Sequence, residues 1–353
     1  MRIAIDAMGG DNAPGAILQG CVEALPLLDE DDALVIVGPR DLISSTLGDA
    51  ANDARILIEE ADDVIEMHES PVEAVRQKPN ASIVKLCKLA SRKAESPVDA
   101  AISAGNTGAM VSAATMFMRR LRGVHRPGIA AVIPSFGGHF VLCDVGANPE
   151  PRSSHLAQYA VMAETYARLA LGIERPRIAQ LSIGSEAGKG TRMTREVRAA
   201  LEQAPGLNYI GYVEGRELFH GAADVVVTDG FVGNSMLKLS EGLASGLLKA
   251  IVREVMEYDG SLAAKLQPVL LSLKKKNDYH EHGAAPLLGV NGACMICHGS
   301  SEPRTIVSAI RITRDYLKSD VNQAIVDRLA DIGPALDRAA SEGAAEEAMQ
   351  EPA

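Results

Sequence analysis

The sequence LSIGSEAGKGT, at residues 181–191, lies between an apolar segment and a charged segment. The apolar segment, 178–183, predicts a strand, and the charged segment, 195–201, favours a helix. The three glycines between them let backbone N–H groups approach an anion without a side chain in the way. The N-terminus of the following helix would add positive partial charge, and Lys189 would add a mobile ammonium group. The stretch therefore predicts a strand–loop–helix unit and is typical of a phosphate site.

This loop is not a Walker A loop, which has four residues between its first glycine and a Gly-Lys pair, followed directly by Ser or Thr. Here three residues separate Gly184 from Gly188, and Gly190 stands between Lys189 and Thr191. An ordinary strand-to-helix turn with a solvated lysine would have a similar sequence. The loop alone leaves both interpretations open.

The composition indicates a folded chain with a large core. The chain has 353 residues, of which 47% are hydrophobic and 23% are charged. Its formal net charge of −11 argues against general nucleic-acid binding. No clear linker divides the chain, so we predict one two-lobed domain over residues 1–338. The acidic residues 339–353 read as a disordered tail.

The start of the chain does not predict export. The apolar run within residues 1–6 is too short for a signal peptide, and no stretch approaches a transmembrane length free of charges. The five cysteines are an odd number in a large chain, which favours reduced thiols. We therefore expect a cytoplasmic protein.

The strand–loop–helix pattern occurs twice more. Residues 98–102 predict a strand, 103–108 a loop and 109–121 a helix, and the same order returns over residues 223–258. Strands that alternate with helices favour an α/β fold with a mainly parallel sheet and helices on both faces, a three-layer α/β/α arrangement. Ligands bind beyond the carboxyl ends of strands in such folds, so we expect the glycine-rich loops to share one sheet edge.

Residues 235–276 differ from the rest. Apolar residues recur there at spacings of three or four, and Gly260 interrupts the run. The pattern predicts two amphipathic helices that form a protruding hairpin. We expect the hairpin to pack against the core or a second subunit. Peripheral membrane contact is the less favoured alternative, in which an apolar tip and the lysines at 274–276 would meet anionic lipid.

The segment Cys294-Met295-Ile296-Cys297-His298 matches the C-x-x-C-H haem-attachment pattern. That chemistry requires export, so we interpret the segment as a strand with small buried thiols. A zinc site would need two more ligands at tight spacing. No G-x-G-x-x-G follows a strand, so the dinucleotide fingerprint is missing as well. We expect no metal and no cofactor.

Two sets of charged residues remain open at this point. Carboxylates at the ends of expected strands could bind a metal, act as bases or orient loop N–H groups, and the last role is the most economical beside an anionic ligand. The basic segment 119–126 is either a solvated helix end, favoured by the helix dipole, or a docking patch for an acidic partner. The carboxylates are Asp6, Asp11, Asp144 and Asp229.

Nine motifs spread over nearly the whole chain resemble one family, the bacterial phosphate acyltransferases (PlsX) of phospholipid synthesis. Their order and number make chance similarity very unlikely. They are IAIDAMGGDNAPG (3–15), SAGNTGA (103–109), RPGIA (126–130), DVGAN (144–148), SIGSEAGKGT (182–191), TDGFVGNSMLK (228–238), LKKKNDY (273–279), APLLGVNG (285–292) and HGSS (298–301).

The resemblance implies an enzyme that moves a fatty acyl group from acyl carrier protein to orthophosphate, giving acyl phosphate. It implies a homodimer whose fold resembles phosphotransacetylases and isocitrate-dehydrogenase-like enzymes, with peripheral membrane contact and a downstream membrane glycerol-3-phosphate acyltransferase as partner. The family's catalytic lysine and asparagine match Lys189, which would hold the phosphate, and Asn234, which would donate to the developing oxyanion.

The same resemblance assigns further residues to binding. The basic cluster becomes a candidate docking site for the carrier protein, at Arg119, Arg120, Arg122 and Arg126. The loops expected to bind phosphate and the acyl thioester contain Gly9, Gly10, Asp11, Ser103, Gly105, Asn106, Thr107, Asp144, Asn148, Gly184, Glu186 and Gly233.

One departure from the family pattern lies at Ala284, where the family usually has glycine. If that position needs a positive φ, Ala284 is strained. Three alternative functions stay open: a phosphotransacetylase-like enzyme that uses acyl-CoA, a membrane scaffold without chemistry of its own, and a hydride-transferring dehydrogenase. The intact motifs at Lys189 and Asn234 argue against the scaffold, and the missing fingerprint argues against the dehydrogenase.

Overall fold

Short runs of Val, Ile, Leu and Ala form one continuous sheet. The computed structural model describes residues 1–186, 188–276 and 283–350 of the chain, and within them the sheet has eleven strands in the order β3-β2-β1-β4-β11-β10-β5-β6-β9-β7-β8. The strands are β1 (Arg2–Asp6), β2 (Ala33–Gly38), β3 (Ile56–Glu60), β4 (Ala100–Ser103), β5 (Gly128–Ser135), β6 (Gly138–Cys143), β7 (Ile178–Leu181), β8 (Tyr209–Val213), β9 (Val225–Val227), β10 (Ala285–Leu288) and β11 (Ala293–Ile296).

The sheet consists of two parallel halves that run in opposite directions. Strands β3, β2, β1, β4 and β11 are mutually parallel in the first lobe, and β6, β9, β7 and β8 are parallel in the second. Between them, β11–β10, β10–β5 and β5–β6 are three antiparallel pairings. Three reversals leave the second half antiparallel to the first. The predicted mainly parallel α/β/α fold is confirmed.

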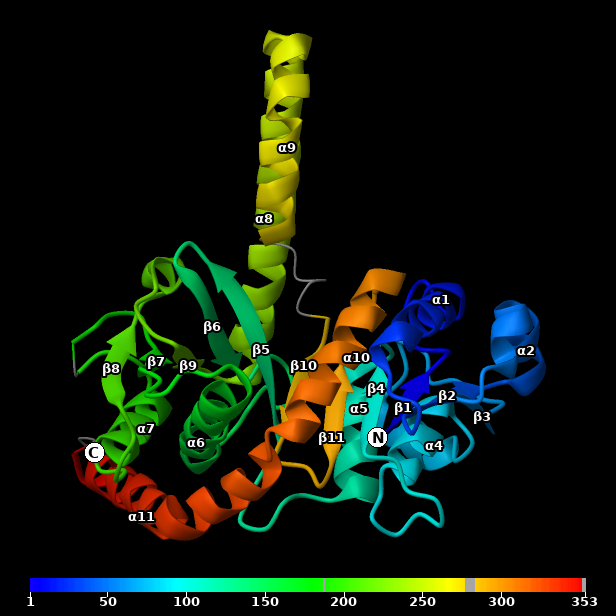
Figure 1. Cartoon of the computed structure of the whole chain (residues 1–353). Coiled ribbons are helices and arrows are strands. Elements are labelled where there is room, and N and C mark those ends of the chain that lie inside the picture. The colour runs from blue at the N-terminus through cyan, green and yellow to red at the C-terminus, as the bar shows by residue number, and fades with distance from the viewer. Residues whose placement is uncertain (187, 277–282, 351–353) are drawn as a thin grey trace.

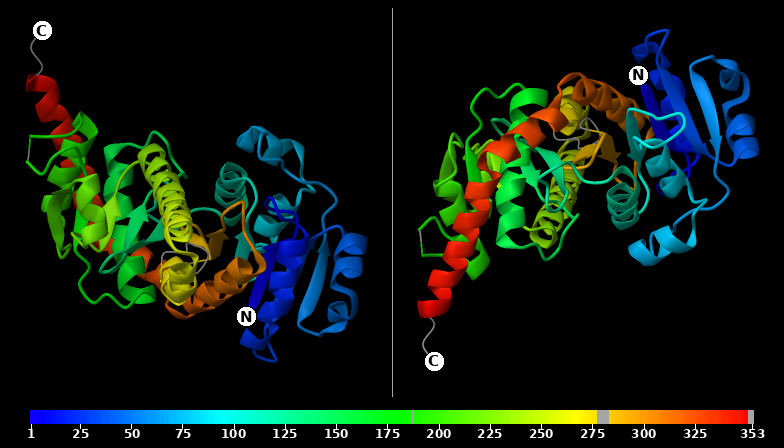
Figure 2. Two further views of the ribbon diagram at one scale, coloured as in Figure 1. Left: turned by 90° about the horizontal axis from the view of Figure 1, so that it is seen from above. Right: turned by 90° about the horizontal axis from the view of Figure 1, so that it is seen from below.

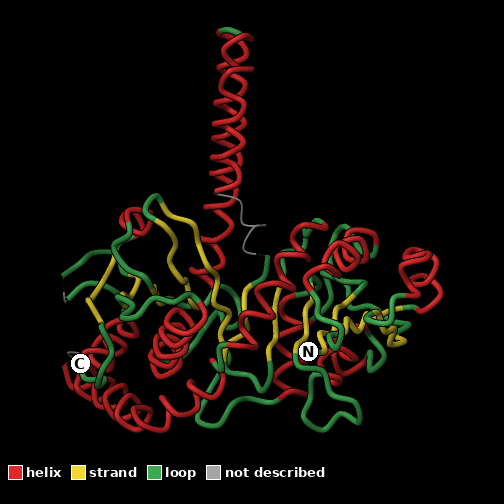
Figure 3. The backbone as a smooth tube through the Cα atoms, viewed as in Figure 1, coloured by secondary structure: helices red, strands yellow, loops and turns green. Residues whose placement is uncertain are grey.

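Helices cover both faces of this sheet (Figures 1 and 3). One face packs against α1, α10, α6, α7 and α11, and the other packs against α3, α4, α5 and the start of α8. The helices are α1 (Gly15–Ala24), α2 (Arg40–Leu47), α3 (Pro71–Gln77), α4 (Ser82–Leu89), α5 (Thr107–Ala113), α6 (Ser153–Ala170), α7 (Arg192–Glu202), α8 (Gly230–Tyr258), α9 (Gly260–Lys276), α10 (Pro303–Lys318) and α11 (Val321–Gln350).

The predicted helical hairpin is present and extends well beyond the two lobes (Figure 1). It consists of α8 and α9, and α9 packs beside the outer part of α8. An apolar stripe on α8 is open to solvent: Leu239, Leu243 and Leu247 are 70%, 65% and 57% exposed. Their spacing of four residues places them on one face of the helix.

Two segments connect the lobes at the side of the molecule away from the hairpin. The first crossing segment, residues 119–127, leads from the helical end of the first lobe into β5. The second, residues 317–323, joins α10, on the first lobe, to α11, which packs on α6 and α7 of the second. Figure 2 shows α11 from below, running across the second lobe.

The structure corrects three expectations from the sequence. The glycine-rich loops occupy two sheet edges rather than one, because the antiparallel pairings reverse the second half. Residues 339–350 continue α11 as a helix, not a disordered tail, consistent with the high helix propensity of Ala and Glu. Ala284 does not have a positive φ; the left-handed conformation falls on Gly283, at φ 59°.

Candidate active site

In the first lobe, three loops meet beyond the carboxyl ends of the parallel strands β1, β4 and β11. The N–H of Asp11 donates to the carbonyl of Gly299 at 2.7 Å, so the loop after β1 is tied to the loop after β11. The amide of Asn12 donates to the carbonyl of Ser301 at 3.1 Å in the same loop. The motifs at 3–15, 103–109 and 298–301 thus form one cluster, the first-lobe loops.

The centre of these loops is packed too closely for larger residues. A Cβ on Gly9 would lie 2.6 Å from the backbone nitrogen of Gly105. Asp6 is fully buried below them, and its carboxylate accepts hydrogen bonds from the Ser103 hydroxyl at 2.7 Å and the Met8 N–H at 3.0 Å. Burial raises the pKa of Asp6, against the effect of these donors. Asp6 and Ser103 therefore orient backbone rather than face solvent.

Asn106 and Thr107 begin α5. The Asn106 side-chain oxygen accepts from the N–H of Ala109 at 3.0 Å as a helix N-cap, while its amide donates to the carbonyl of Glu66 at 3.1 Å. Asn106 is buried, so its side chain positions the loop. Gly10, with φ 101°, and the exposed Asp11 lie at the accessible side of the same cluster.

In the second lobe, Asp144 organises the loop after β6. Its Oδ1 accepts from the N–H groups of Ile129, Gly146 and Ala147 at 2.9, 3.2 and 3.0 Å, and its Oδ2 accepts from Asn148 at 2.7 Å. The residue is completely buried, and burial raises its pKa while the four donors oppose the rise. The loop-orienting role expected for a strand-end carboxylate is confirmed for Asp144.

The loop that starts α8 packs directly on this one. The N–H of Gly230 donates to the carbonyl of Asn148 at 2.9 Å, and a Cβ on Gly233 would lie 1.9 Å from the carbonyl oxygen of Asp144. Asn234 follows, and its side chain lies beside Gly146, 3.6 Å from the position of a Cβ there. Asn148 itself donates to the carbonyl of Pro127 and to the Tyr159 hydroxyl, both at 2.7 Å.

The loop after β7 is separate from these two. Lys189 is exposed, and a Cβ on Gly184 would lie 3.1 Å from its Cγ and 2.8 Å from a carboxylate oxygen of Glu186. The hydroxyl of Thr191 accepts from the N–H of Thr194 at 3.2 Å and caps α7. The helix N-terminus expected after the loop is therefore present, and it adds positive partial charge.

Below this loop lie buried polar groups that have no hydrogen-bond partner among the residues the structure describes. They include both amide atoms of Gln180, which is fully buried, and the hydroxyl of Ser182. Buried polar atoms are nearly always paired in folded proteins, by protein or by bound solvent.

The structure does not bring Lys189 and Asn234 together. Figure 1 shows the green loop of residues 182–191 at the outer end of the second lobe, whereas α8 begins near the centre of the molecule. The view from above in Figure 2 shows the same separation. Asn234 is grouped with Asp144, Asn148 and Gly233, and Lys189 with Gly184 and Glu186.

One contact between the lobes was not predicted from the sequence. Glu241, on α8, approaches the first-lobe loops, and its Oε2 lies 3.7 Å from Nε2 of His298. Its side chain is only 17% exposed, and burial raises its pKa whereas His298 and Lys238 lower it. Glu241 follows Asn234 by seven residues, two helical turns, so the two share a face of α8 about 10 Å apart.

The arginines of the first crossing segment have different surroundings in the structure. A guanidinium nitrogen of Arg120 donates to the carbonyl of His125, and Arg122 lies on a cavity between the crossing segments. Arg126 is exposed and precedes Pro127, whose carbonyl accepts from Asn148. Arg119 has a left-handed backbone with φ 71°. The cluster is therefore adjacent to the Asp144 loop but is not one uniform patch.

Two further expectations concern the thiols and the membrane. Cys294 and Cys297 are buried at and just after β11, so the predicted strand with small buried thiols is confirmed; burial raises the pKa of each thiol to about 12. No helix in the described part of the chain has the length and apolar character needed to cross a membrane.

Sequence comparisons identify close relatives over almost the full length. A family model described as "Fatty acid synthesis protein" matches residues 1–324. A phosphate acyltransferase from Trichlorobacter lovleyi is 44% identical over 337 residues, which cover 94% of this chain and 95% of the relative. A phosphate acyltransferase from Desulfitobacterium hafniense is 43% identical over 334 residues, with 93% and 98% covered.

Comparison with solved structures gives the same fold in more distant proteins. A phosphotransacetylase from Streptococcus pyogenes superposes with a TM-score of 0.57 at 16% identity, with 90% of this chain and 94% of that chain covered. A branched-chain phosphotransacylase from Enterococcus faecalis gives a TM-score of 0.55 at 16% identity, with 90% and 100% covered. At these identities the likeness establishes the fold alone.

Proposed function

Because the chain belongs to the phosphate acyltransferase family and is an acyltransferase enzyme, we propose that it transfers a fatty acyl group from acyl carrier protein to orthophosphate. The product is acyl phosphate for phospholipid synthesis. The observation that carries the proposal is the pair of strand–loop–helix units that contain Lys189 and Asn234, within a chain that matches its relatives over nearly their full length.

The two units supply complementary chemistry. The loop after β7 offers a lysine and a helix N-terminus, which together suit a phosphate dianion. Asn234, held beside Gly146, is an amide donor for the oxyanion that develops on the thioester carbonyl, a contact typically worth about 3 kcal/mol. The glycine-rich first-lobe loops face α8 and would enclose the thioester and its acyl chain.

The reaction needs no covalent enzyme intermediate. An oxygen of hydrogen phosphate attacks the carbonyl carbon, the carbon–sulfur bond breaks, and the proton of hydrogen phosphate ends on the carrier thiol. The products are acyl phosphate and the free carrier protein. Holding both reactants in line in a ternary complex supplies a large part of the rate. Cofactors and metals have no part in this scheme.

Single substitutions test the two roles. Lys189→Ala and Asn234→Ala should each reduce acyl phosphate formation by at least about a hundredfold, as loss of one oxyanion or phosphate contact does elsewhere. Lys318→Ala and Asn52→Ala, two substitutions outside the candidate site, are the matched controls and should keep the activity of the unaltered chain. Near-normal activity of both Lys189→Ala and Asn234→Ala would contradict the proposal.

The separation of Lys189 from Asn234 raises a second question, which the same variants answer. Either the loop of residues 182–191 moves toward Asn234 within one chain, or the two residues meet across a homodimer. Mixing Lys189→Ala with Asn234→Ala protein and letting subunits exchange should restore activity only if the site is shared between subunits. If activity stays absent after exchange, the site lies within one chain, and the loop of residues 182–191 moves toward Asn234.

We propose that the carrier protein docks on the basic first crossing segment. This segment is joined to the Asp144 loop through Pro127 and Asn148, and that loop contacts the start of α8 through Gly230. A carrier bound there would have its thioester near Asn234. Charge reversal at Arg119 and Arg120 should weaken carrier binding and reduce its salt dependence. Unchanged affinity would remove this surface from the proposal.

The hairpin suits a homodimer and a peripheral membrane contact. The apolar stripe at Leu239, Leu243 and Leu247 would be buried by a second subunit, whereas the exposed Met256 and Tyr258 lie near the hairpin end. We place the enzyme in the cytoplasm, at times on the membrane surface beside a glycerol-3-phosphate acyltransferase that uses its product.

The membrane contact can be tested. The side chains of residues 274–276, predicted to meet lipid, lie outside the described part. Flotation with vesicles of anionic lipid tests the contact, and loss of flotation on Met256→Glu is the expected result.

The likeness to phosphotransacetylases supports one alternative, an enzyme that uses acyl-CoA. Parallel assays with palmitoyl carrier protein and acetyl-CoA separate the two. We expect the carrier protein substrate to be used with the higher kcat/KM. A preference for acetyl-CoA would replace the proposed donor but leave the acceptor, orthophosphate, unchanged.

A further inference from the structure

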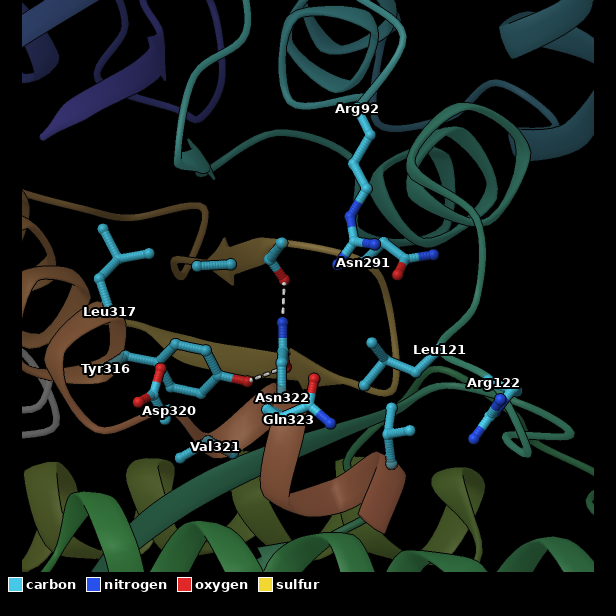
Figure 4. Close-up of a pocket in the computed structure, with 13 residues that line it drawn as sticks. Arg92, Leu121, Arg122, Asn291, Tyr316, Leu317, Asp320, Val321, Asn322 and Gln323 are labelled. Carbon is cyan, nitrogen blue, oxygen red and sulfur yellow. Dashed lines mark hydrogen bonds between the residues drawn. The ribbon is translucent and has the colours of Figure 1, made fainter. Parts of the chain in front are cut away.

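A cavity of about 380 Å³ lies between the two crossing segments, on the side of the first lobe opposite its glycine-rich loops (Figure 4). We call it the hinge cavity. Residues from both crossing segments line it, together with the turn between β10 and β11 and Arg92, which follows α4. We infer that the hinge cavity is an effector site for a small organic phosphate, a phosphate monoester with a hydroxyl-bearing body.

The turn at residues 290–292 anchors both crossing segments at the cavity. The N–H of Asn291 donates to the carbonyl of Arg119, and its side-chain amide donates to the carbonyl of Arg120, both at 2.9 Å. On the other side, the Asn322 amide donates to the carbonyl of Gly292 at 2.9 Å, and the Tyr316 hydroxyl donates to the Asn322 side-chain oxygen at 2.8 Å. A ligand in the cavity therefore lies against both crossing segments and the turn that anchors them.

The backbone supports this as a place where the lobes hinge. Arg119 and Asp320, one in each crossing segment, are the non-glycine residues with positive φ in the described part of the chain, at 71° and 51°. Such conformations cost about 1–3 kcal/mol each and cluster at sites that change shape or bind ligands. Both residues adjoin the hinge cavity, and the carboxylate of Asp320 lines it.

The charges of the lining select the ligand. Arg92 and Arg122 line the cavity, and neither guanidinium has a hydrogen-bond or ion-pair partner among the described residues. Both arginines are exposed, and Figure 4 shows them on different sides of the cavity, so each can donate to phosphate oxygens from its own side. Asp320 stands among the lining residues as well, and Figure 4 shows it away from Arg92 and Arg122. A carboxylate accepts hydrogen bonds from hydroxyl groups, so the ligand needs an anionic end and a hydroxyl end.

The size of the cavity also favours a ligand larger than orthophosphate. Orthophosphate alone would leave the region around Asp320 and the apolar side chains of Leu121 and Val321 without a partner. A phosphate monoester of a short polyol would fill more of the cavity and carry hydroxyl groups beyond its phosphate. Occupancy would join Arg92, on the first lobe, to the second crossing segment and so fix the lobe angle. This effector role goes beyond acyl transfer and does not depend on it.

The test is a binding titration of the intact chain with glycerol 3-phosphate, the simplest probe that has both groups. Inorganic phosphate and glycerol are the comparison probes. We expect saturable binding of glycerol 3-phosphate, weaker binding of phosphate and none of glycerol. The double variant Arg92→Ala/Arg122→Ala should bind at least about tenfold more weakly, whereas Arg175→Ala, an exposed arginine elsewhere, should bind as the unaltered chain does.

Three results would overturn the inference: no saturable binding of glycerol 3-phosphate, equal affinity for inorganic phosphate, or undiminished binding by the double variant. Hydrogen exchange of the complex adds a test of the hinge role. Residues 119–127 and 317–323 should become protected on binding, and unchanged exchange there would refute the coupling to lobe angle. None of these measurements uses an acyl donor, so their failure is distinguishable from failure of the proposed acyl transfer.

Discussion

The contact between Gly233 and Asp144 allows a sharp test of how the candidate site is assembled. Replacing Gly233 with alanine would place a Cβ 1.9 Å from the carbonyl oxygen of Asp144, where ordinary contact begins at 3.4 Å. Because the obstacle is backbone and not a flexible side chain, the start of α8 would have to move away from the Asp144 loop by about 1.5 Å. Asn234, the next residue, would move with it.

Both stability and activity should respond. Overpacking of a well-packed core costs about 1–3 kcal/mol, and a backbone obstacle places this site at the upper end or beyond. Misplacement of a catalytic group by about 1 Å can cost about a hundredfold in rate. We therefore expect Gly233→Ala to lower the unfolding midpoint in urea and to reduce kcat/KM for acyl phosphate formation by about a hundredfold, measured under conditions where the variant is folded.

Gly215→Ala is the matched control, because a Cβ there meets nothing within 4 Å and the backbone is not left-handed. It should leave kcat/KM unchanged. A Gly233→Ala protein with unchanged kcat/KM and unchanged urea midpoint would refute the close packing of α8 on the Asp144 loop, and with it the position assigned to Asn234.

Three further predictions follow from single features. Arg119→Gly should stabilise the chain by about 1 kcal/mol in urea unfolding, because Arg119 has φ 71° and ψ 165°, a conformation that glycine alone adopts readily. Arg122→Gly, the control, should not stabilise the chain. Equal effects of the two substitutions would contradict backbone strain at Arg119. Because the pKa of Glu241 is raised, the folded state binds a proton on its carboxylate more tightly than the unfolded state does. The free energy of unfolding, relative to that of Glu241→Gln, should therefore fall as pH rises from the ordinary pKa of 4.5 through the raised pKa. A difference between the two proteins that does not change with pH would argue against burial of Glu241. Cys294, with its thiol pKa raised to about 12, should resist iodoacetamide at pH 8 in the folded protein and react on unfolding, as followed by mass spectrometry.

Local sequence features predicted much of the fold. Apolar runs located strands, and spacings of three and four located the hairpin, because side-chain periodicity depends only on nearby residues. The strand predicted at 178–183 is β7, Ile178–Leu181, and the strand predicted at 98–102 overlaps β4, Ala100–Ser103. The reversal of the second lobe could not be predicted this way, because it depends on the pairing of β10 with β5, which lie more than 100 residues apart in the chain.

The candidate site was predicted in its parts rather than in its arrangement. Gly9 and Gly233 were predicted through the family resemblance, and the structure gives the physical reason for glycine there, because a Cβ would meet neighbouring backbone. The contact between Glu241 and His298 was not predicted, since a buried carboxylate on a surface-patterned helix has no local signature. The separation of Lys189 from Asn234 also follows from long-range packing, which motif order does not encode.

The measurement that tests the central claim most directly is a product assay. The purified chain is incubated with palmitoyl carrier protein and phosphate, and hydroxylamine then traps acyl phosphate as the hydroxamate. We predict palmitoyl hydroxamate in proportion to enzyme and dependent on added phosphate, with its loss on Lys189→Ala or Asn234→Ala. Release of free palmitate without trapped product, or no release of carrier thiol, would contradict acyl transfer from carrier protein to phosphate.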